Sequence, residues 1–228
     1  MTIRYVCLFD IDGTLIASGG AGKAALETAL AAEHGIEKIM PKLRLSGRTD
    51  VAICKDLLEM AGLSSEMESI RQLHRAYLQH LPDSLSRSTG SVLPGIGSLL
   101  EDLSQREDVL LGLLTGNLRE GAKVKLGHFG LDHYFRIGGF GDHHLDRDDV
   151  AREAWSAIEG TGANVQPEQV WVLGDTPLDV QCARAIGANV VAVATGWHSL
   201  EDLEPSKPDL LVESLADPHP FLRLLSAG

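Results

Sequence analysis

Short apolar runs alternate with amphipathic stretches along most of this chain. Five of these runs are rich in valine and leucine, which is typical of strands buried in a parallel sheet. They are Val6–Phe9, Val109–Leu114, Val170–Leu173, Val190–Val193 and Leu210–Val212. Helical patterns lie around the later runs, at 96–103, Leu118–Phe129, Asp148–Ile158 and Leu178–Ile186. This alternation predicts an α/β fold in which helices cover both faces of a parallel sheet.

The strand pattern is interrupted between about residue 17 and residue 90. Helical patterns replace it at Gly22–His34, at Asp50–Met60 with Asp50 as the cap, and at Ile70–Leu81 with Ser65 and Glu68 as a capping box. We therefore expect two domains, a core of residues 1–16 and 91–228 and an all-helical insert of residues 17–90.

The junctions of this insert are rich in small residues. Ser18-Gly19-Gly20 and Ser86–Gly90 are flexible enough to act as hinges. The insert is then a cap that closes over the strand ends. A helical decoration that does not move is the alternative.

Composition narrows the class of protein. The 228 residues are 44% hydrophobic, enough for a sizeable core, and carry a net charge of −12. That charge argues against nucleic acid and against anionic membranes as partners. It leaves anionic substrates open, because a metal ion and a few basic side chains can reverse the sign locally. No apolar run approaches the roughly 20 residues of a membrane span.

The predicted location is cytoplasmic. The N-terminus has no signal-peptide pattern. Three cysteines, Cys7, Cys54 and Cys182, lie scattered within apolar patterns. This is typical of reduced cysteines in a cytosolic protein. The sequence leaves monomer and homodimer equally open.

Two aspartates follow the first strand. Asp10 and Asp12 flank Ile11, and Gly13-Thr14 turns the chain directly afterwards. Ligands of open α/β sheets bind at such strand ends. If the chain leaves the extended geometry at this turn, the two side chains can point in different directions. One carboxylate can then serve as metal ligand and nucleophile while the other acts as acid or base. An ordinary acidic turn is the alternative.

Polar residues also follow two later strands. Thr115-Gly116-Asn117 offers a hydroxyl, an unobstructed backbone N–H and a helix start, which suit a phosphate or an oxyanion. Asp175 and Asp179 lie four residues apart around a turn and suit Mg²⁺, which prefers oxygen ligands. A plain strand-to-helix turn and a helix N-cap are the respective alternatives.

Basic and histidine residues lie between these elements. Arg147, within an acidic run, could neutralise carboxylates and phosphate, or it could be a solvated surface charge. His143-His144 beside Asp142 has the residue types of a transition-metal site. We favour a polar loop near the site instead, because the oxygen-rich motifs specify Mg²⁺ better than Zn²⁺.

Together these motifs resemble those of the haloacid dehalogenase-like phosphohydrolases. Asp10-Ile11-Asp12-Gly13-Thr14 matches the first motif of that superfamily, Thr115 the second, and Gly174-Asp175 with Asp179 the fourth. The third motif usually has a lysine. Here Arg147 stands in that region, and Lys123 and Lys125 come too early in the chain for it. Arginine keeps the charge but presents it as a planar fork.

The resemblance implies a Rossmann-like core with a helical cap inserted after the first motif. The chain is most similar to the phosphoglycolate phosphatase and β-phosphoglucomutase branch. Residues 45–50 resemble the cap specificity loop of that branch. Arg48 is then the candidate that grips the non-reacting end of the substrate, and an exposed arginine beside a helix is the alternative.

The resemblance also implies a mechanism for a Mg²⁺-dependent phosphatase. Asp10 attacks the phosphorus of a phosphate monoester and forms a phosphoaspartyl intermediate. Asp12 acts as acid and then as base. Mg²⁺ is held by Asp10, Asp175 and the Asp12 carbonyl, with Asp179 as a ligand or as support for the ligands. Thr115, Gly116 and Asn117 hold the phosphoryl oxygens, and Arg147 orients Asp10. The substrate is a small phosphorylated metabolite such as 2-phosphoglycolate.

Other members of the superfamily are the rivals of this interpretation. Haloacid dehalogenases lack an acid at the position of Asp12, and phosphonate-cleaving relatives need a cap lysine, for which the surroundings of Lys23 give no support. A sugar-phosphate mutase of the β-phosphoglucomutase type would use the same core residues. A catalytically silent binding protein would have no chemical reason to retain Asp10, Asp12, Thr115 and Asp175.

Overall fold

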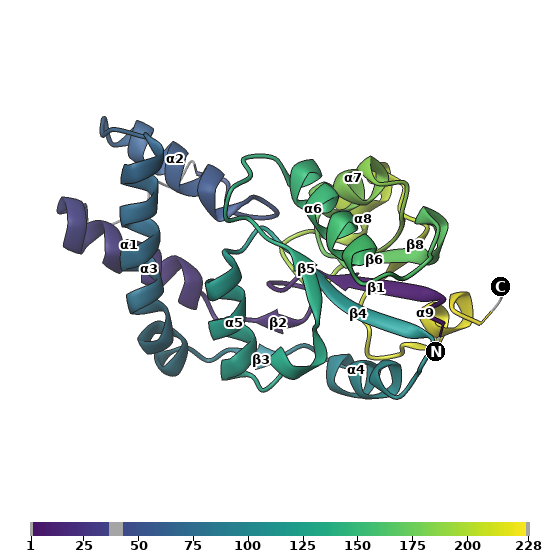
Figure 1. Cartoon of the computed structure of the whole chain (residues 1–228). Coiled ribbons are helices and arrows are strands. Elements are labelled where there is room, and N and C mark those ends of the chain that lie inside the picture. Colours follow the sequence, from purple (N-terminus) through teal and green to yellow (C-terminus); the bar gives the residue numbers. More distant parts are fainter. Residues whose placement is uncertain (1, 37–42, 227–228) are drawn as a thin grey trace.

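A six-stranded sheet forms the centre of the molecule, which we describe from a computed structural model for residues 2–36 and 43–226 (Figure 1). Its strand order is β5-β4-β1-β6-β7-β8, and every neighbouring pair is parallel. The strands are β1 (Tyr5–Phe9), β4 (Val109–Leu114), β5 (Ile137–Gly139), β6 (Val170–Gly174), β7 (Asn189–Val193) and β8 (Leu210–Val212). The α/β class expected from the sequence is confirmed.

Two hydrophobic clusters fill the two faces of this sheet. Alternate residues of β1 point to opposite faces, so that Val6 and Leu8 belong to one cluster and Cys7 and Phe9 to the other. The first cluster is closed by α6 (Arg147–Gly160), α7 (Pro177–Ala185) and α8 (Leu200–Leu203). The second is closed by α4 (Ile96–Ser104), α5 (Arg119–His128) and α9 (His219–Leu224). Because both faces are covered, the polar strand ends are where chemistry can take place.

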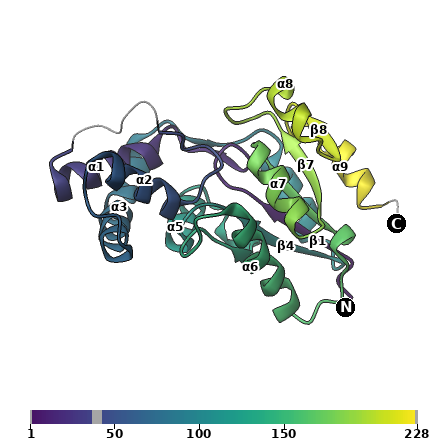
Figure 2. The same cartoon turned by 90° about the horizontal axis from the view of Figure 1, so that it is seen from above.

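Three helices form an insert after the first strand, beyond one end of the sheet (Figures 1 and 2). They are α1 (Ala21–His34), α2 (Asp50–Met60) and α3 (Met67–Arg87). They bury a hydrophobic cluster of their own, which Leu118 of the sheet-containing part also joins. A short antiparallel ribbon, β2 (Ile16–Ala17) with β3 (Ser91–Val92), pairs the two chain segments that lead into and out of the insert.

Several boundaries differ from the sequence-based predictions. The N-cap of α2 is Thr49, whose hydroxyl accepts the Ala52 N–H, and Asp50 is the first helical residue. The predicted box of Ser65 and Glu68 does not form, because α3 begins at Met67 after Glu66. Strand β5 and the β2–β3 ribbon had no counterpart in the predictions.

The three cysteines lie in the core, as their apolar surroundings in the sequence predicted. Cys7, Cys54 and Cys182 are buried and have free thiols. Across residues 2–36 and 43–226, no helix combines the length and apolarity that crossing a membrane requires.

Candidate active site

The predicted polar strand ends meet at one edge of the sheet. Asp10 follows β1, Thr115 follows β4 and Asp175 follows β6. Because β1 lies between β4 and β6, these three residues are neighbours in space although the chain separates them widely. All three are buried. The Asp10 N–H donates to the Leu173 carbonyl at 2.9 Å, which extends the ladder between β1 and β6 into the site.

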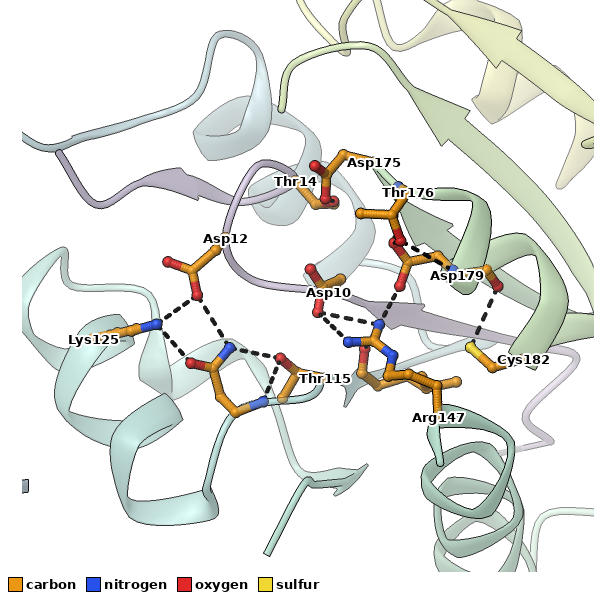
Figure 3. A network of polar contacts seen from close by, with 12 residues as sticks. Asp10, Asp12, Thr14, Thr115, Lys125, Arg147, Asp175, Thr176, Asp179 and Cys182 are labelled. Carbon is orange, nitrogen blue, oxygen red and sulfur yellow. Dashed lines mark hydrogen bonds and ion pairs between the residues drawn. The ribbon is translucent and has the colours of Figure 1, made fainter. Parts of the chain in front are cut away.

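Asp10, Asp175 and Asp179 form a buried carboxylate cluster (Figure 3). Each offers an oxygen within 4.8 Å of the others, and among residues 2–36 and 43–226 no other group of histidines, cysteines and acids meets this criterion. Burial, followed by the charges of Asp179 and Asp10, raises the pKa of Asp175 to about 9. Burial also raises the pKa of Asp10 to about 7, against the opposing effect of Arg147. An all-oxygen cluster with excess negative charge suits a hard divalent cation.

Glycines allow the chain to approach Asp175 closely. A Cβ at Gly13 would lie 2.4 Å from Asp175 Oδ2, and a Cβ at Gly196 would lie 1.7 Å from the same atom. The Thr14 hydroxyl donates to Asp175 Oδ1 at 3.4 Å. Any larger residue at positions 13 or 196 would displace this carboxylate.

The Asp179 carboxylate has more hydrogen-bond and ion-pair partners than the Asp175 carboxylate. Its Oδ2 accepts the N–H and the hydroxyl of Thr176 in a capping box at the start of α7. Its Oδ1 pairs with Arg147. Within the described part of the chain, the Asp175 side chain has only the long hydrogen bond from Thr14. Asp175 is therefore the freer ligand for a cation, and Asp179 is fixed by its neighbours.

The raised pKa values predict how stability depends on pH. A carboxyl whose pKa is raised by folding favours the folded state most below its unfolded pKa of about 3.9, and this stability is lost as pH rises through the folded pKa. We therefore expect the melting temperature of the metal-free protein to fall between about pH 5 and about pH 9.

A divalent cation should reverse this loss. Added Mg²⁺ should raise the melting temperature more at about pH 8.5 than at about pH 5.5, because the ligands must be deprotonated. Differential scanning fluorimetry measures both effects, and Asp175→Asn is the control that should flatten them. An equal Mg²⁺ effect at both pH values would contradict the assignment of these carboxyls to a cation site.

Arg147 is the buried cation of this cluster. It is the first residue of α6, with Asp146 as N-cap, and is 4% exposed. Its guanidinium donates to Asp10 Oδ1 at 3.4 Å, to the Leu114 carbonyl at 3.5 Å, and to Asp179. Burial works against its charge, but Asp179 and Asp10 raise the pKa of Arg147 above its ordinary value. The surface-charge alternative for Arg147 is therefore wrong.

Asp12 belongs to a separate network. Its Oδ2 accepts from Lys125 Nζ at 2.5 Å and from Asn117 Nδ2 at 3.1 Å (Figure 3). The Asn117 amide nitrogen also donates to Thr115 Oγ1 at 2.8 Å. Burial works to raise the pKa of Asp12, but Lys125 and Asn117 lower it overall below its ordinary value. The two aspartates of the first motif thus face different partners.

Lys125 is the site residue that the sequence-based reasoning missed. That reasoning tested it only as the lysine of the third motif, for which it comes too early. It lies on the buried face of α5 beside Ala122 and Leu126, whereas Lys123 is exposed. A lysine among the apolar positions of a helix was the available indication, because such a charge needs a buried partner.

The insert contacts the Thr115–Leu118 turn directly. The Asp50 N–H donates to the Gly116 carbonyl, and the Leu118 N–H donates to Asp50 Oδ2, both at 2.8 Å. A Cβ on Gly116 would lie 2.1 Å from the Arg48 carbonyl. Burial raises the pKa of Asp50 to about 6. Asp50 therefore joins the insert to the predicted phosphate cradle.

The side chain of Arg48 does not join this cluster. Its guanidinium pairs with Asp56 at 2.8 Å and donates to the carbonyls of Arg44 and Ala52. The loop around residue 48 reaches the site through its backbone, and local contacts of α2 hold the charged group. The role of Arg48 in substrate binding stays a prediction.

The remaining polar residues lie apart from the cluster. His144 Nε2 bonds to Glu153 Oε2 at 2.8 Å, and His143 lines a cavity of about 220 Å³ beside α3. His144 is thus paired with an acid of α6, and His143 borders the insert. Trp197, next to Gly196, is 90% exposed.

Comparisons with known proteins identify a family and several relatives. The model of the haloacid dehalogenase-like hydrolase family matches residues 7–193. The chain is 32% identical over 220 residues to the phosphoglycolate phosphatase of Synechococcus elongatus, covering 92% of this chain and 93% of that protein. It is 24% identical over 234 residues to the phosphoglycolate phosphatase of Escherichia coli K12, covering 95% and 91%.

A solved structure has the same fold. CbbY from Rhodobacter sphaeroides, determined in complex with phosphate, superposes with a TM-score of 0.75 over 95% of this chain and 96% of that one. The two sequences are 19% identical, so this likeness concerns the fold alone.

Proposed function

Because the chain belongs to the haloacid dehalogenase-like hydrolase family, we propose that it is a Mg²⁺-dependent phosphatase that forms a phosphoaspartyl intermediate on Asp10. The observation that carries this proposal is the separation of the two aspartates. Asp10 lies in the acidic cluster beside Arg147, and Asp12 lies in a network with Lys125 and Asn117. One carboxylate can therefore attack phosphorus while the other handles protons.

In the first step Asp10 attacks the phosphorus of a phosphate monoester, and the bond between phosphorus and the leaving oxygen breaks. Arg147 fixes one oxygen of Asp10 and leaves the other for attack. The Thr115 hydroxyl and the Gly116 N–H hold the phosphoryl oxygens, and Asn117 supports them by donating to Thr115 Oγ1. Arg48 would contribute to substrate binding only after releasing Asp56.

Asp12 moves the protons. The lowered pKa keeps Asp12 charged in the free protein, so it takes up the proton of a phosphate ester that binds as its monoanion. That proton passes to the leaving alkoxide as the ester bond breaks. The resulting carboxylate then takes a proton from the water that attacks the phosphoaspartate, which releases inorganic phosphate and restores the carboxyl. The partial exposure of Asp12, with 37% of its side chain accessible, suits a group that meets both substrate and water.

Asp10, Asp175 and the Asp12 main-chain carbonyl are the proposed Mg²⁺ ligands, and Asp179 supports them. The fit rests on the oxygen-only donor set and on the raised pKa values of Asp10 and Asp175. When bound, Mg²⁺ would neutralise charge on the phosphate and on Asp10, so that an anion can approach an anion.

We also propose that residues 17–90 act as a cap domain over a core of residues 1–16 and 91–228. The Asp50 contacts and the approach of Arg48 to Gly116 support a cap that covers the site. A covered site favours a small phosphorylated metabolite over a polymer. The names of the relatives favour 2-phosphoglycolate.

A screen of small phosphate monoesters tests this function. The panel should contain 2-phosphoglycolate, p-nitrophenyl phosphate, and β-glucose 1-phosphate with a bisphosphate primer. We expect release of inorganic phosphate with Mg²⁺, loss of activity in EDTA, and recovery when Mg²⁺ is restored. Isomerised sugar phosphate without phosphate release would instead identify a mutase. Failure to hydrolyse any compound would contradict the enzyme assignment.

A further inference from the structure

Helix α5 buries a charged residue that the mechanism above does not use. Lys125 is 4% exposed and lies among the apolar residues of that helix. Removing an ammonium group from water costs several kcal/mol unless it is paired with good geometry. Its Nζ has two such partners, Asp12 Oδ2 at 2.5 Å and Asn117 Oδ1 at 2.6 Å. Lys125 is thus held by two residues of the proposed site.

These contacts fix the orientation of Asn117. A lysine ammonium only donates hydrogen bonds, so the carbonyl oxygen of the amide must face Lys125. The amide nitrogen then faces Asp12 Oδ2 and Thr115 Oγ1, to which it donates. Thr115 Oγ1 also accepts the Asn117 main-chain N–H at 3.3 Å, a contact that does not involve Lys125, so the proposed phosphate cradle keeps this anchor without the lysine. A change at Lys125 would release the Asp12 carboxylate and the Asn117 side-chain amide.

The same contacts restrain Asp12. Both bonds fall on Oδ2. Because the Asp12 side chain is partly exposed, packing alone does not hold it in one conformation. Lys125 reaches it from a rigid helix that packs against the sheet. Effective proton transfer requires a donor within hydrogen-bond reach of the leaving oxygen.

We propose that Lys125 is a positioning residue that holds Asp12 and Asn117 in the arrangement needed for proton transfer to the leaving group. This inference rests on the proposed phosphatase function. Lys125 would hold the residues that face the leaving group. Arg147 and the carboxylate cluster do not fill this role.

The test compares two leaving groups. An alkyl phosphate found by the screen needs a proton on its leaving oxygen, whereas p-nitrophenolate leaves with little assistance. Because kcat/KM reports steps up to the first irreversible one, it isolates the departure of the leaving group. We expect Lys125→Met to lower kcat/KM for the alkyl phosphate about 100-fold and for p-nitrophenyl phosphate less than about 3-fold. Lys123→Met, on the exposed face of the same helix, is the matched control and should change neither value.

A second variant separates positioning from folding. Asp12→Asn combined with Lys125→Met removes both charges of the pair, so it should fold even if Lys125→Met alone does not. Relative to Asp12→Asn, the double variant should lose less than about 2-fold in kcat/KM for the alkyl phosphate, because the two residues act as a unit.

The outcomes are distinguishable. Equal losses for both substrates, or additive losses in the double variant, would overturn the positioning role and leave the phosphatase function intact. A wild-type protein that hydrolyses neither substrate would overturn the proposed function and this inference with it.

Discussion

Asp10→Asn is expected to abolish turnover while the protein stays folded. An amide cannot replace the carboxylate that attacks phosphorus, and uncatalysed hydrolysis of phosphate monoesters is extremely slow. We expect kcat to fall by at least about 10⁴-fold. The melting temperature of the metal-free variant should not fall, because the substitution removes one of three crowded acids. A loss of activity without a loss of stability would identify a chemical role.

Two measurements check this result. Phosphate release gives the rate, and mass spectrometry of acid-quenched protein should find a phosphoryl group on the wild-type peptide that contains Asp10. Asp132→Asn, at an exposed position after α5, controls for the general effect of removing an acid. If Asp10→Asn retained more than a few per cent of the wild-type rate, the nucleophile would have to be another residue.

Arg147→Met is expected to have the largest effect on stability. It would leave Asp10 and Asp179 buried without the cation that both contact. Breaking a buried ion pair by removing one partner costs about 3–5 kcal/mol. In the metal-free protein the loss should be smaller at about pH 5, where the carboxyl groups with raised pKa values bind protons.

Urea unfolding in EDTA at the two pH values measures this loss. Arg147→Lys keeps a charge but not the planar fork, so it should recover part of the stability. Combining Arg147→Met with Asp179→Asn should also recover part of it, because fewer acids remain unpaired. A loss below about 1 kcal/mol at neutral pH would mean that Arg147 does not compensate the cluster.

The positions of Asp10, Thr115 and Asp175 could be predicted because of a general property of parallel sheets. Residues that directly follow neighbouring strands meet at one edge, however far apart they lie in the chain. The apolar runs identified the strands, and the polar residues after them identified the edge. Strand β5 escaped prediction because Ile137-Gly138-Gly139 has no apolar run, and its pairing with β4 comes from tertiary contacts.

Side-chain partners were less predictable than strand ends. Arg48 lies in the expected loop, but Asp56, in the second turn of α2, binds its guanidinium. Lys125 comes eight residues after Asn117, and only the rotation of α5 brings it to Asp12. Such choices depend on distances of a few ångströms, which neither hydrophobic periodicity nor motif spacing determines.

The central place of β1 in the sheet determines when, during synthesis, the surroundings of Asp10 can form. Its partners are residues 109–114 and 170–174, so the strand that leads to Asp10 is synthesised long before either neighbour. Chains emerge from the ribosome N-terminus first, and pairings between distant segments form slowly. All three insert helices are made before the first of these partners. A nascent chain can therefore complete the surroundings of Asp10, the proposed nucleophile, only after β6 has been translated, and we expect incomplete chains to form no phosphoaspartate.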